Sequence, residues 1–575
     1  MLRRIFSYMK EYKKYAWLAL ICIGVEVVLE IMVPKLMADL IDIGVTNSDV
    51  PYIINKGIQM AVCAVAALIL GVGSARFSAL AGQGLGANIR KAEYEKLQSY
   101  SFSNIDHFSV SSLVTRLTSD VTNIQNAVST GMRPFGRSPV MLIFATTLAF
   151  QINSTLALVF LVALPVLAVL LIIIIINVGP RYGRMQGAVD LVNRCIEENL
   201  TAVRVVKSYV RGDYEIEKFR NVNDNLKNES EKAFGIAVLN MPAMQFVMYS
   251  TILGILLIGG RLINSGQMMI GQLTSFLSYV LLILNSLMMM SNVFLLMTRS
   301  LASAERIMKV IDEPIDITDE NAKDIEVKKG EIEFNHVWFK YKDTAKEYVL
   351  SDVSFHINAG QTVGIIGQTG SSKTTLIQLI PRLYDASKGE IKIDGISIKE
   401  YPVRHLRDAI SVVLQKNTLF SGSLIDNLRW GDENATLDEI KEACSIACVD
   451  EFIDRLPGGL DAEMGQEGVN VSGGQKQRIC IARAILKKPK VLILDDSTSA
   501  VDTATEGKIR NALAKKLPDM TKIIIAQRIS SVRHADQIII MDGGCVNAIG
   551  THESLLKTNK IYQEIYESQK EGADL

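Results

Sequence analysis

Two neighbouring carboxylates, Asp495 and Asp496, follow an unbroken apolar run from Val491 to Leu494. Such a run is typical of a strand that is buried on both faces of a parallel sheet. A carboxylate at the end of such a strand can bind Mg²⁺, and a second one beside it can act as a general base. The second residue is Asp, whose side chain is one methylene shorter than that of Glu and so reaches less far as a base. The question is therefore whether the site hydrolyses its ligand or only holds it.

A glycine-rich segment, GIIGQTGSSKTTL at residues 364–376, follows one expected strand and opens an expected helix. It resembles the P-loop, in which glycines let backbone N–H groups wrap a phosphate and a lysine reaches the β- and γ-phosphates. The strict pattern has Gly at position 372, where this chain has Ser372, and we expect the small Ser side chain to be accepted there. The residues expected to bind phosphate are Gly367, Gln368, Thr369, Gly370, Ser371, Ser372, Lys373, Thr374 and Thr375.

The segment NVSGGQKQRICIARAI, residues 470–485, resembles the LSGGQ signature of the ATP-binding cassette (ABC) family. It stands between the P-loop and the two carboxylates, as it does in that family. At the start of a helix, a Ser hydroxyl and open N–H groups suit the γ-phosphate of a nucleotide held by another subunit. The resemblance implies that the following residues bind the partner's ATP: Ser472, Gly473, Gly474 and Gln475.

The resemblance covers almost the entire chain and implies roles for further residues. Tyr341 would stack on adenine, and the loop containing Ser499 and Asp502 would cross the seam between two cassettes. The implied cofactors are ATP and Mg²⁺. The metal ligands would be Thr374, Gln415 and Asp495.

Length and composition indicate several domains, of which the first lies in a membrane. The chain has 575 residues, 49% of them hydrophobic, and its formal net charge of zero gives no global attraction to nucleic acid. Six apolar segments could each contribute a membrane span, for which a helix needs about 20 residues. They lie near 16–36, 57–76, 138–152, 155–178, 242–262 and 272–297.

We therefore expect a multidomain membrane protein. An all-α, six-helix transmembrane domain with long cytosolic extensions should occupy residues 1–310, and a charged linker should occupy 311–330. An α/β P-loop cassette should occupy 331–575. This arrangement resembles the half-transporters of bacterial multidrug-type ABC exporters.

The distribution of Lys and Arg predicts the orientation. Both are frequent in residues 80–137 and 180–240, so we expect these two helical hairpins and both termini to be cytosolic, in a bacterial cytoplasmic membrane. By the resemblance, coupling segments would lie near 109–120 and 209–219.

Polar residues inside the expected spans suggest a substrate cavity. Glu26 and Glu30 lie one helical turn apart, and an intramembrane carboxylate is a functional hypothesis by default. Packing against a polar neighbour is the equally weighted alternative. Ser278, Asn285 and Asn292 recur at seven-residue intervals and form one polar stripe on the last span.

Two residues depart from the family pattern, Asp496 where it has Glu and Gln527 where it has a switch His. A shorter base sits farther from its target, and Gln cannot carry the charge or proton that His supplies. The chain therefore resembles the degenerate-site subunit of heterodimeric exporters, with slow hydrolysis at its own catalytic residues. A slow homodimer that exports peptides or lipids, and a membrane-tethered ATP-sensing subunit, remain as alternatives to a heterodimeric exporter of small amphipathic molecules.

Overall fold

The computed structural model describes the chain except for residues 1, 321, 343, 497–500 and 572–575, and it describes some helical residues by their backbone alone. The chain forms two compact units. One consists of Met1–Gln98 with Val110–Glu313, and the other of Ser99–Ser109 with Pro314–Leu575. We call them the helical unit and the cassette unit, and each is described by itself.

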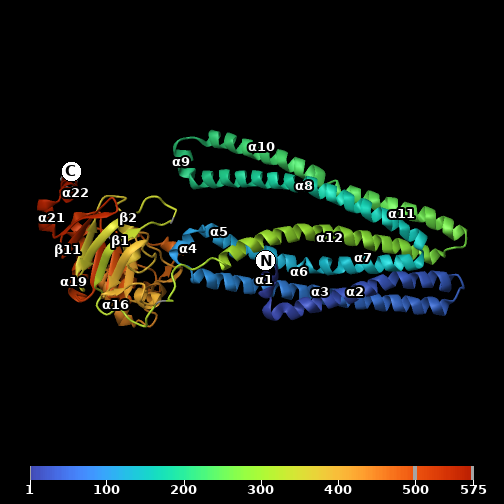
Figure 1. Cartoon of the computed structure of the whole chain (residues 1–575), viewed down its shortest axis with the longest axis horizontal. Helices are drawn as coiled ribbons and strands as arrows, with labels where there is room; N and C mark the ends of the chain where they lie inside the picture. Colours follow the sequence, from blue (N-terminus) through green and yellow to red (C-terminus); the bar gives the residue numbers. More distant parts are fainter. Residues whose placement is uncertain (1, 321, 343, 497–500, 572–575) are drawn as a thin grey trace. The chain divides into compact units, whose positions relative to one another are not determined.

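The helical unit is built from long helices joined by short turns (Figure 1). Its α-helices are α1 (Leu2–Ser7), α2 (Lys13–Asp39), α3 (Val50–Gln98), α5 (Val110–Thr115), α6 (Val121–Ser129), α7 (Met132–Ile152), α8 (Ser154–Thr201), α9 (Val203–Ser208), α10 (Gly212–Ala237), α11 (Asn240–Asn264) and α12 (Ile270–Ile311). A 3₁₀ turn covers Lys10–Tyr12, and π-helical turns cover Leu40–Val45 and Arg116–Asp120.

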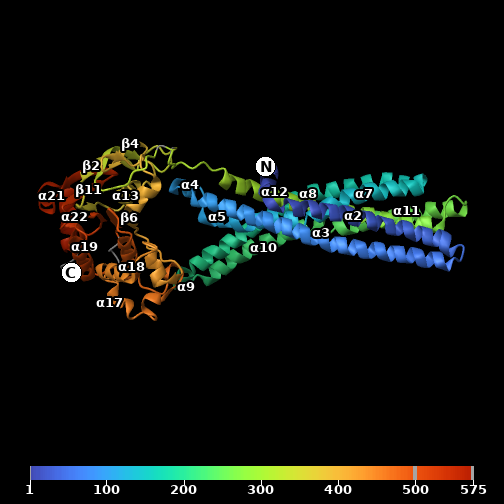
Figure 2. The same cartoon turned by 90° about the horizontal axis from the view of Figure 1, so that it is seen from below.

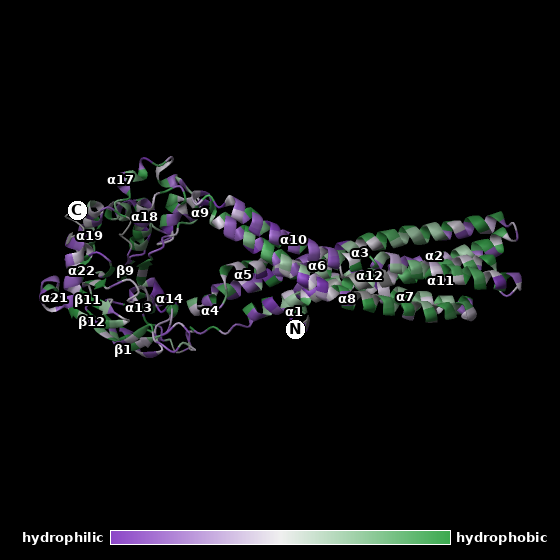
Figure 3. Cartoon of the chain, turned by 90° about the horizontal axis from the view of Figure 1, so that it is seen from above, coloured by the Kyte–Doolittle hydropathy of each residue, from purple (hydrophilic) through white to green (hydrophobic). Residues whose placement is uncertain are grey.

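The six expected apolar segments lie in α2, α3, α7, α8, α11 and α12. Within the described residues, four stretches are long and apolar enough to cross a membrane: Lys10–Val45, Val50–Gln98, Val110–Ile152 and Gly212–Asn264. The apolar parts of α8 and α12 include residues whose side chains are not described. Figure 3 shows hydrophobic residues along α2, α3, α7 and α11, and hydrophilic residues along much of α10.

Two tight connections explain how these helices reverse direction. Asn153 is the only residue between α7 and α8, and its side chain accepts hydrogen bonds from the N–H groups of Thr155 (3.0 Å) and Leu156 (3.1 Å). This N-cap satisfies donors that the first turn of α8 would otherwise leave unpaired. At the opposite end of α8, α9 forms the tip of the hairpin with α10 (Figure 1), where Val210 has a φ of 54°.

The cassette unit contains three sheets. Its strands are β1 (Ile332–Phe339), β2 (Leu350–Ile357), β3 (Thr362–Ile366), β4 (Lys388–Ile393), β5 (Ile396–Ser397), β6 (Ile410–Val413), β7 (Gly422–Ser423), β8 (Glu463–Met464), β9 (Val491–Asp495), β10 (Thr521–Ile525), β11 (Gln537–Asp542) and β12 (Cys545–Gly550). The main sheet has the order β12-β11-β3-β10-β9-β6 and is parallel except for β12. An antiparallel sheet has the order β2-β1-β4-β5, and β7 pairs with β8.

Helices cover these sheets (Figure 2). They are α4 (Phe102–Asp106), α13 (Lys373–Leu379), α14 (Val403–Asp408), α15 (Leu424–Arg429), α16 (Leu437–Ile446), α17 (Asp450–Ile453), α18 (Gly473–Leu486), α19 (Thr503–Lys516), α20 (Ile529–Val532), α21 (His552–Thr558) and α22 (Lys560–Glu571). Single 3₁₀ turns cover Gly459–Asp461 and Gln466–Gly468.

The short helix α4 packs within the cassette unit although it precedes that unit by 200 residues in the chain. The hydroxyl of Tyr384 donates a 2.8 Å hydrogen bond to Asp106, and the amide of Asn104 donates one of 2.8 Å to the carbonyl of Pro314. Residues 110–120, within the first expected coupling segment, form α5 and a π-helical turn in the helical unit.

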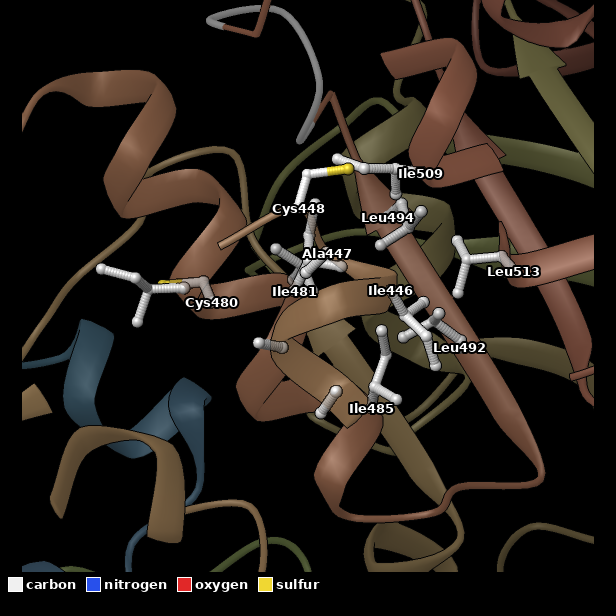
Figure 4. Packing of buried hydrophobic residues seen from close by; sticks show 14 of the residues in the cluster. Ile446, Ala447, Cys448, Cys480, Ile481, Ile485, Leu492, Leu494, Ile509 and Leu513 are labelled. Carbon is white, nitrogen blue, oxygen red and sulfur yellow. The ribbon is translucent and has the colours of Figure 1, made fainter. Parts of the chain in front are cut away.

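The main sheet positions the site because β3 and β9 both pair in parallel with β10, so their carboxyl ends meet at one edge. Ile525 at the end of β10 stands opposite Ile365 on one side and Asp495 on the other. Figure 4 shows Leu492 and Leu494 of β9 packed beside Ile481 in the larger core of the unit. This dense packing holds the end of β9 in place.

Candidate functional site

The glycine-rich loop between β3 and α13 opens onto a cavity of about 330 Å³. The cavity brings together residues that lie 158 positions apart in the sequence. Its described lining residues are Thr369, Gly370, Ser371, Ser372, Lys373, Thr374, Thr375, Gln415, Asp495, Asp496, Ile525 and Gln527.

Lys373 folds back over the loop that precedes it. Its ammonium group donates hydrogen bonds to the carbonyl oxygens of Gly367 and Gln368, both at 2.8 Å, and to the hydroxyl of Ser371 at 3.1 Å. Burial lowers the pKa of Lys373, and the nearby Asp496 and Asp495 oppose that shift. A phosphate entering the cavity would give this ammonium an anionic partner in place of neutral oxygens.

Position 367 requires glycine because the surrounding atoms leave no space for a side chain. A Cβ atom there would lie 2.2 Å from the carbonyl oxygen of Met541 and 2.6 Å from the hydroxyl of Ser371. Gly370 has a φ of +87°, which favours glycine for conformational reasons.

Ser372, where the strict pattern has Gly, also lies in the left-handed region, with a φ of 66° at the N-cap of α13. A non-glycine residue costs roughly 1–2 kcal/mol in this conformation. The Ser side chain is therefore accommodated, but with local backbone strain that the sequence pattern alone did not reveal.

Thr374 and Asp495 form the pair that could hold Mg²⁺. The Thr374 hydroxyl donates to Oδ2 of Asp495 at 3.0 Å, and Asp495 is only 2% exposed. Burial raises the pKa of Asp495, and the Thr374 hydrogen bond opposes that rise. A hydroxyl and a carboxylate oxygen at this separation fit the preference of Mg²⁺ for oxygen ligands. The remaining expected ligand, Gln415, lines the same cavity.

Two side-chain amides donate hydrogen bonds to the same carboxylate oxygen of Asp496. Gln527 donates to Oδ2 at 2.9 Å and Gln415 at 3.4 Å. Burial raises the pKa of Asp496, and the hydrogen bond from Gln527 opposes the rise. The carboxylate is thus held at the edge of the cavity by two amides, which can donate N–H hydrogen bonds but cannot carry a proton away.

Tyr341 lies beside the phosphate loop on the outer side of α13. Its side chain is about half exposed, and its hydroxyl lies 2.9 Å from that of Thr375 and donates to Gln378 at 3.2 Å. Its ring meets that of Tyr384 edge-on, with centroids 5.2 Å apart. An exposed ring next to the phosphate loop is compatible with the expected stacking on adenine.

The signature residues cap α18 and do not belong to the cavity as described. The hydroxyl of Ser472 accepts from the N–H of Gln475 at 3.3 Å, and the Gln475 side chain accepts from the N–H of Ser472 at 2.9 Å. This capping box leaves Ser472 and Gly473 exposed. Asp502 caps α19 by accepting from the N–H of Thr505 at 2.9 Å, whereas Ser499 lies outside the described residues.

Two glutamines that the sequence motifs did not indicate bind backbone groups next to the site. Gln477, buried in α18, donates to the backbone carbonyl of Asp496 at 3.3 Å. Gln569 of α22 holds the backbone on both sides of Arg528: it donates to the carbonyl of Gln527 at 2.7 Å and accepts from the N–H of Ile529 at 2.8 Å. Gln477 follows the signature by two residues and could have been noticed, but no pattern points to Gln569.

The helical unit contains a separate cavity of about 810 Å³. Four residues of the expected substrate site line it: Glu26, Glu30, Ser278 and Asn285. The side chain of the fifth, Asn292, is not described. The remaining lining residues are Val33, Pro34, Ala64, Ala67, Leu68, Gly71, Val72, Ala75, Arg133, Leu281 and Leu282.

The two glutamates in this cavity are paired with arginines of α7. Glu26, 3% exposed, lies 2.5 Å from Arg133 and 3.4 Å from Arg137, and Glu30 lies 2.6 Å from Arg137. These arginines stand four residues apart just before the third apolar segment, a position that does not by itself reveal their carboxylate partners. The two carboxylates and two guanidinium groups balance in charge, which lowers the cost of burying them.

Comparison with known proteins identifies both units. The family model described as ABC transporter transmembrane region matches residues 16–287, and the one described as ABC transporter matches residues 350–499. An uncharacterised ABC transporter ATP-binding protein of Bacillus subtilis (strain 168), YfiB, is 37% identical over 575 residues, covering 100% of both chains. An ATP-dependent lipid A-core flippase of Pseudomonas putida is 32% identical and covers 98% of this chain and 95% of its own.

A solved structure of a bacterial Atm1-family ABC exporter with ATP bound shares the fold. It superposes with a TM-score of 0.84 at 22% identity, covering 97% of this chain and 99% of that chain. The expected fold, a helical transmembrane domain followed by an α/β nucleotide-binding cassette, is thereby confirmed. With one transmembrane region, one cassette and full-length relatives of the same organisation, the chain belongs to the ABC transporter family.

Proposed function

We propose that this chain is one half of an ATP-driven exporter that moves amphipathic small molecules, drugs or lipids, across the bacterial cytoplasmic membrane. The observation that supports it best is the cavity of about 810 Å³ in the helical unit of a chain that also carries an ABC cassette. Most of its described lining residues are apolar, and the charged ones are Glu26, Glu30 and Arg133. Such a lining suits a ligand with an apolar body and a polar head.

The pairing of Glu26 and Glu30 with arginines refines the substrate class. The four charged groups balance, so the cavity as a whole offers neither a strong anionic nor a strong cationic field. Removing one carboxylate would leave a guanidinium charge uncompensated. Glu26 and Glu30 offset the positive charges of their neighbours Arg133 and Arg137. Export of cationic substrates therefore depends on these glutamates, because without them the cavity would repel a cation.

We further propose that the ATP site formed by this chain's own catalytic residues turns over slowly. Asp496 has a short side chain, and Gln527 binds its Oδ2 directly at 2.9 Å. In a site with Glu and His at these positions, the base reaches farther and the switch residue can be charged. A misplacement on the order of 1 Å can cost about a hundredfold in rate.

ABC exporters act as dimers, and here we propose a heterodimer. Ser472 is exposed at the start of α18, and its hydroxyl, which accepts from the N–H of Gln475, can still donate its own proton toward the ATP of a partner. Paired with a second half-transporter that has Glu and His, it would complete one fast site and leave one slow site. Both termini and the two long helical hairpins would be cytosolic.

The first experiment is to express the chain alone, purify it in lipid nanodiscs, and measure its mass and Mg²⁺-ATPase rate. A poorly active or unpaired chain is the expected result. A stable homodimer that turns over at about 1 s⁻¹ or more would contradict the slow site and the heterodimer. A chain reconstituted with its partner in proteoliposomes should show substrate-stimulated ATPase and dye accumulation, whereas an ATP sensor would show neither.

A further inference from the structure

A second cavity of the cassette unit, of about 580 Å³, lies beside α20, α21 and α22. We call it the C-terminal basic pocket. It is lined by Arg528, Ile529, Ser530, Arg533, His552, Tyr566, Gln569 and Lys570. It shares no described lining residue with the ATP cavity. Figure 2 shows α21 and α22 next to each other, and α22 packs on both α20 and α21.

Three cationic side chains line this pocket, and of the three only Arg528 is near enough to a described carboxylate, that of Asp496, to affect its pKa. Arg528, Arg533 and Lys570 are exposed, and among the described residues none of them forms an ion pair. No described lining residue is acidic. Elsewhere on the same unit, exposed lysines do pair: Lys488 with Glu439 and Lys508 with Glu451. The pocket therefore concentrates positive charge.

The pKa of the neighbouring His534 is shifted in the direction expected from positive charge around the pocket. Its pKa is lowered, first by burial and then by the positive charges of Arg510, Arg533 and His552. Arg510 itself donates to the carbonyl of Ser530 at 2.9 Å and so adds a further cation behind the pocket wall. Like charges gathered at one surface repel one another, and a bound anion would relieve that repulsion.

One loop joins the basic pocket to the ATP site, because adjacent residues of this loop line the two cavities. Arg528 lines the basic pocket, and its immediate neighbour Gln527 lines the ATP cavity and donates to Asp496. Gln569, which also lines the basic pocket, holds this loop by hydrogen bonds of 2.7 Å and 2.8 Å on either side of Arg528. A shift of α22 would therefore move the backbone that positions the Gln527 amide.

We propose that the C-terminal basic pocket binds an anion carrying two or more phosphate groups, and that its occupancy regulates ATP turnover through Gln569 and Gln527. Guanidinium groups bind phosphate with two parallel hydrogen bonds, and the cavity is larger than a single phosphate requires. The rings of Tyr566 and His552, with centroids 5.9 Å apart, form a less polar wall for the remainder of such a molecule. Binding stands on this geometry alone, whereas regulation rests on the proposed ATPase function.

Binding is tested with inorganic tripolyphosphate on the full-length protein in nanodiscs, by isothermal titration calorimetry with the ATP site saturated by Mg²⁺ and a non-hydrolysable ATP analogue. The test variant is Arg533→Gln with Lys570→Gln. The matched control is Lys515→Gln with Lys557→Gln, which removes two exposed cations outside the pocket. We expect a Kd that rises at least about tenfold in the test variant and little in the control, since charged hydrogen bonds are lost only in the former.

Equal weakening in both variants, or no measurable binding to the unmodified protein at low salt, would overturn the proposal. The source of the phosphate is distinguished by the lipid of the nanodisc. If an anionic lipid headgroup fills the pocket, tripolyphosphate affinity should fall when cardiolipin, which carries two phosphates, replaces phosphatidylcholine. A soluble ligand leaves the affinity unchanged between the two lipids.

Regulation is tested with Gln569→Ala, which removes the clamp but retains the cations. We expect this variant to retain measurable tripolyphosphate binding through Arg528, Arg533 and Lys570, while its ATP turnover no longer responds to saturating tripolyphosphate. A retained response would overturn the role of Gln569. Because binding is measured without hydrolysis or transport, loss of the proposed export function would leave the binding result intact.

Discussion

The side-chain amide of Gln527 donates a 2.9 Å hydrogen bond to Oδ2 of Asp496, so the two residues that depart from the family pattern contact each other. Gln415 donates to the same oxygen at 3.4 Å. The carboxylate of Asp496 is therefore restrained by neutral amides. Because Asp496 and Gln527 are in direct contact, substitutions at these two positions should have non-additive effects on ATP turnover.

Asp496→Glu combined with Gln527→His should raise ATP turnover at this chain's own site. Glu extends the carboxylate by one methylene, and His can carry charge and a proton. We expect an increase of about a hundredfold for the double change and much less for either single change. Single-site ATPase, with the partner's site inactivated, measures it. A flat rate after the double change would show that the degeneracy is not the cause of slow turnover.

Ser372→Gly should relieve the backbone strain at the start of α13, because Ser372 has a φ of 66°. We expect a stabilisation of ~1 kcal/mol, seen as a higher melting temperature of the cassette transition, with ATP binding retained. Ser372→Ala is the matched control, since it removes the hydroxyl but keeps a Cβ in the left-handed region. If the Ala variant gains as much stability as the Gly variant, the strain argument is wrong.

Glu26→Gln and Glu30→Gln should each weaken export of cationic dyes. Glu26→Gln leaves Arg133 without its carboxylate, whereas Glu30→Gln leaves Arg137 with only its longer contact to Glu26, and either change makes the cavity more positive. Because Glu26 is 3% exposed and contacts both arginines, its replacement should also destabilise the helical unit, by about 3 kcal/mol. Transport of several dyes in proteoliposomes and thermal unfolding measure the two effects.

Asp39→Asn is the control for the glutamate variants, because Asp39 pairs with Lys56 at 2.9 Å outside the cavity lining. It should leave dye export unchanged. Unchanged transport of several cationic dyes by both glutamate variants would remove these residues from the substrate site.

The pH dependence of ATP hydrolysis should report the environment of Asp496. Burial raises the pKa of this carboxyl, so its active, ionised form is lost at a higher pH than for an ordinary Asp as the solution is acidified. Gln527 donates to the ionised form and opposes that rise. Gln527→Ala should therefore move the acidic limb of the kcat/KM profile to still higher pH. A limb that stays in place, or moves to lower pH, would contradict the assignment of Asp496 as the base.

Much of the cassette and its ATP site was determined by local sequence. The alternation of apolar strands and loops, the left-handed backbone at Gly370, and the capping residues at Ser472 and Asp502 act within a few residues of themselves. Parallel strands then bring Asp495 to Thr374 at the edge of the sheet. Local steric and hydrogen-bonding rules therefore sufficed to predict most of the residues that line the ATP cavity.

Other features arise only when distant segments pack together. The pairing of Glu26 with Arg133 joins α2 to α7, and Gln569 reaches the loop of Gln527 from the C-terminal helix. Neither contact has a fixed spacing in the chain, because each depends on how whole helices pack. The sequence by itself determined which residues could bind phosphate and cross a membrane. Only the tertiary structure decided which charges neutralise one another and which side chain positions Gln527.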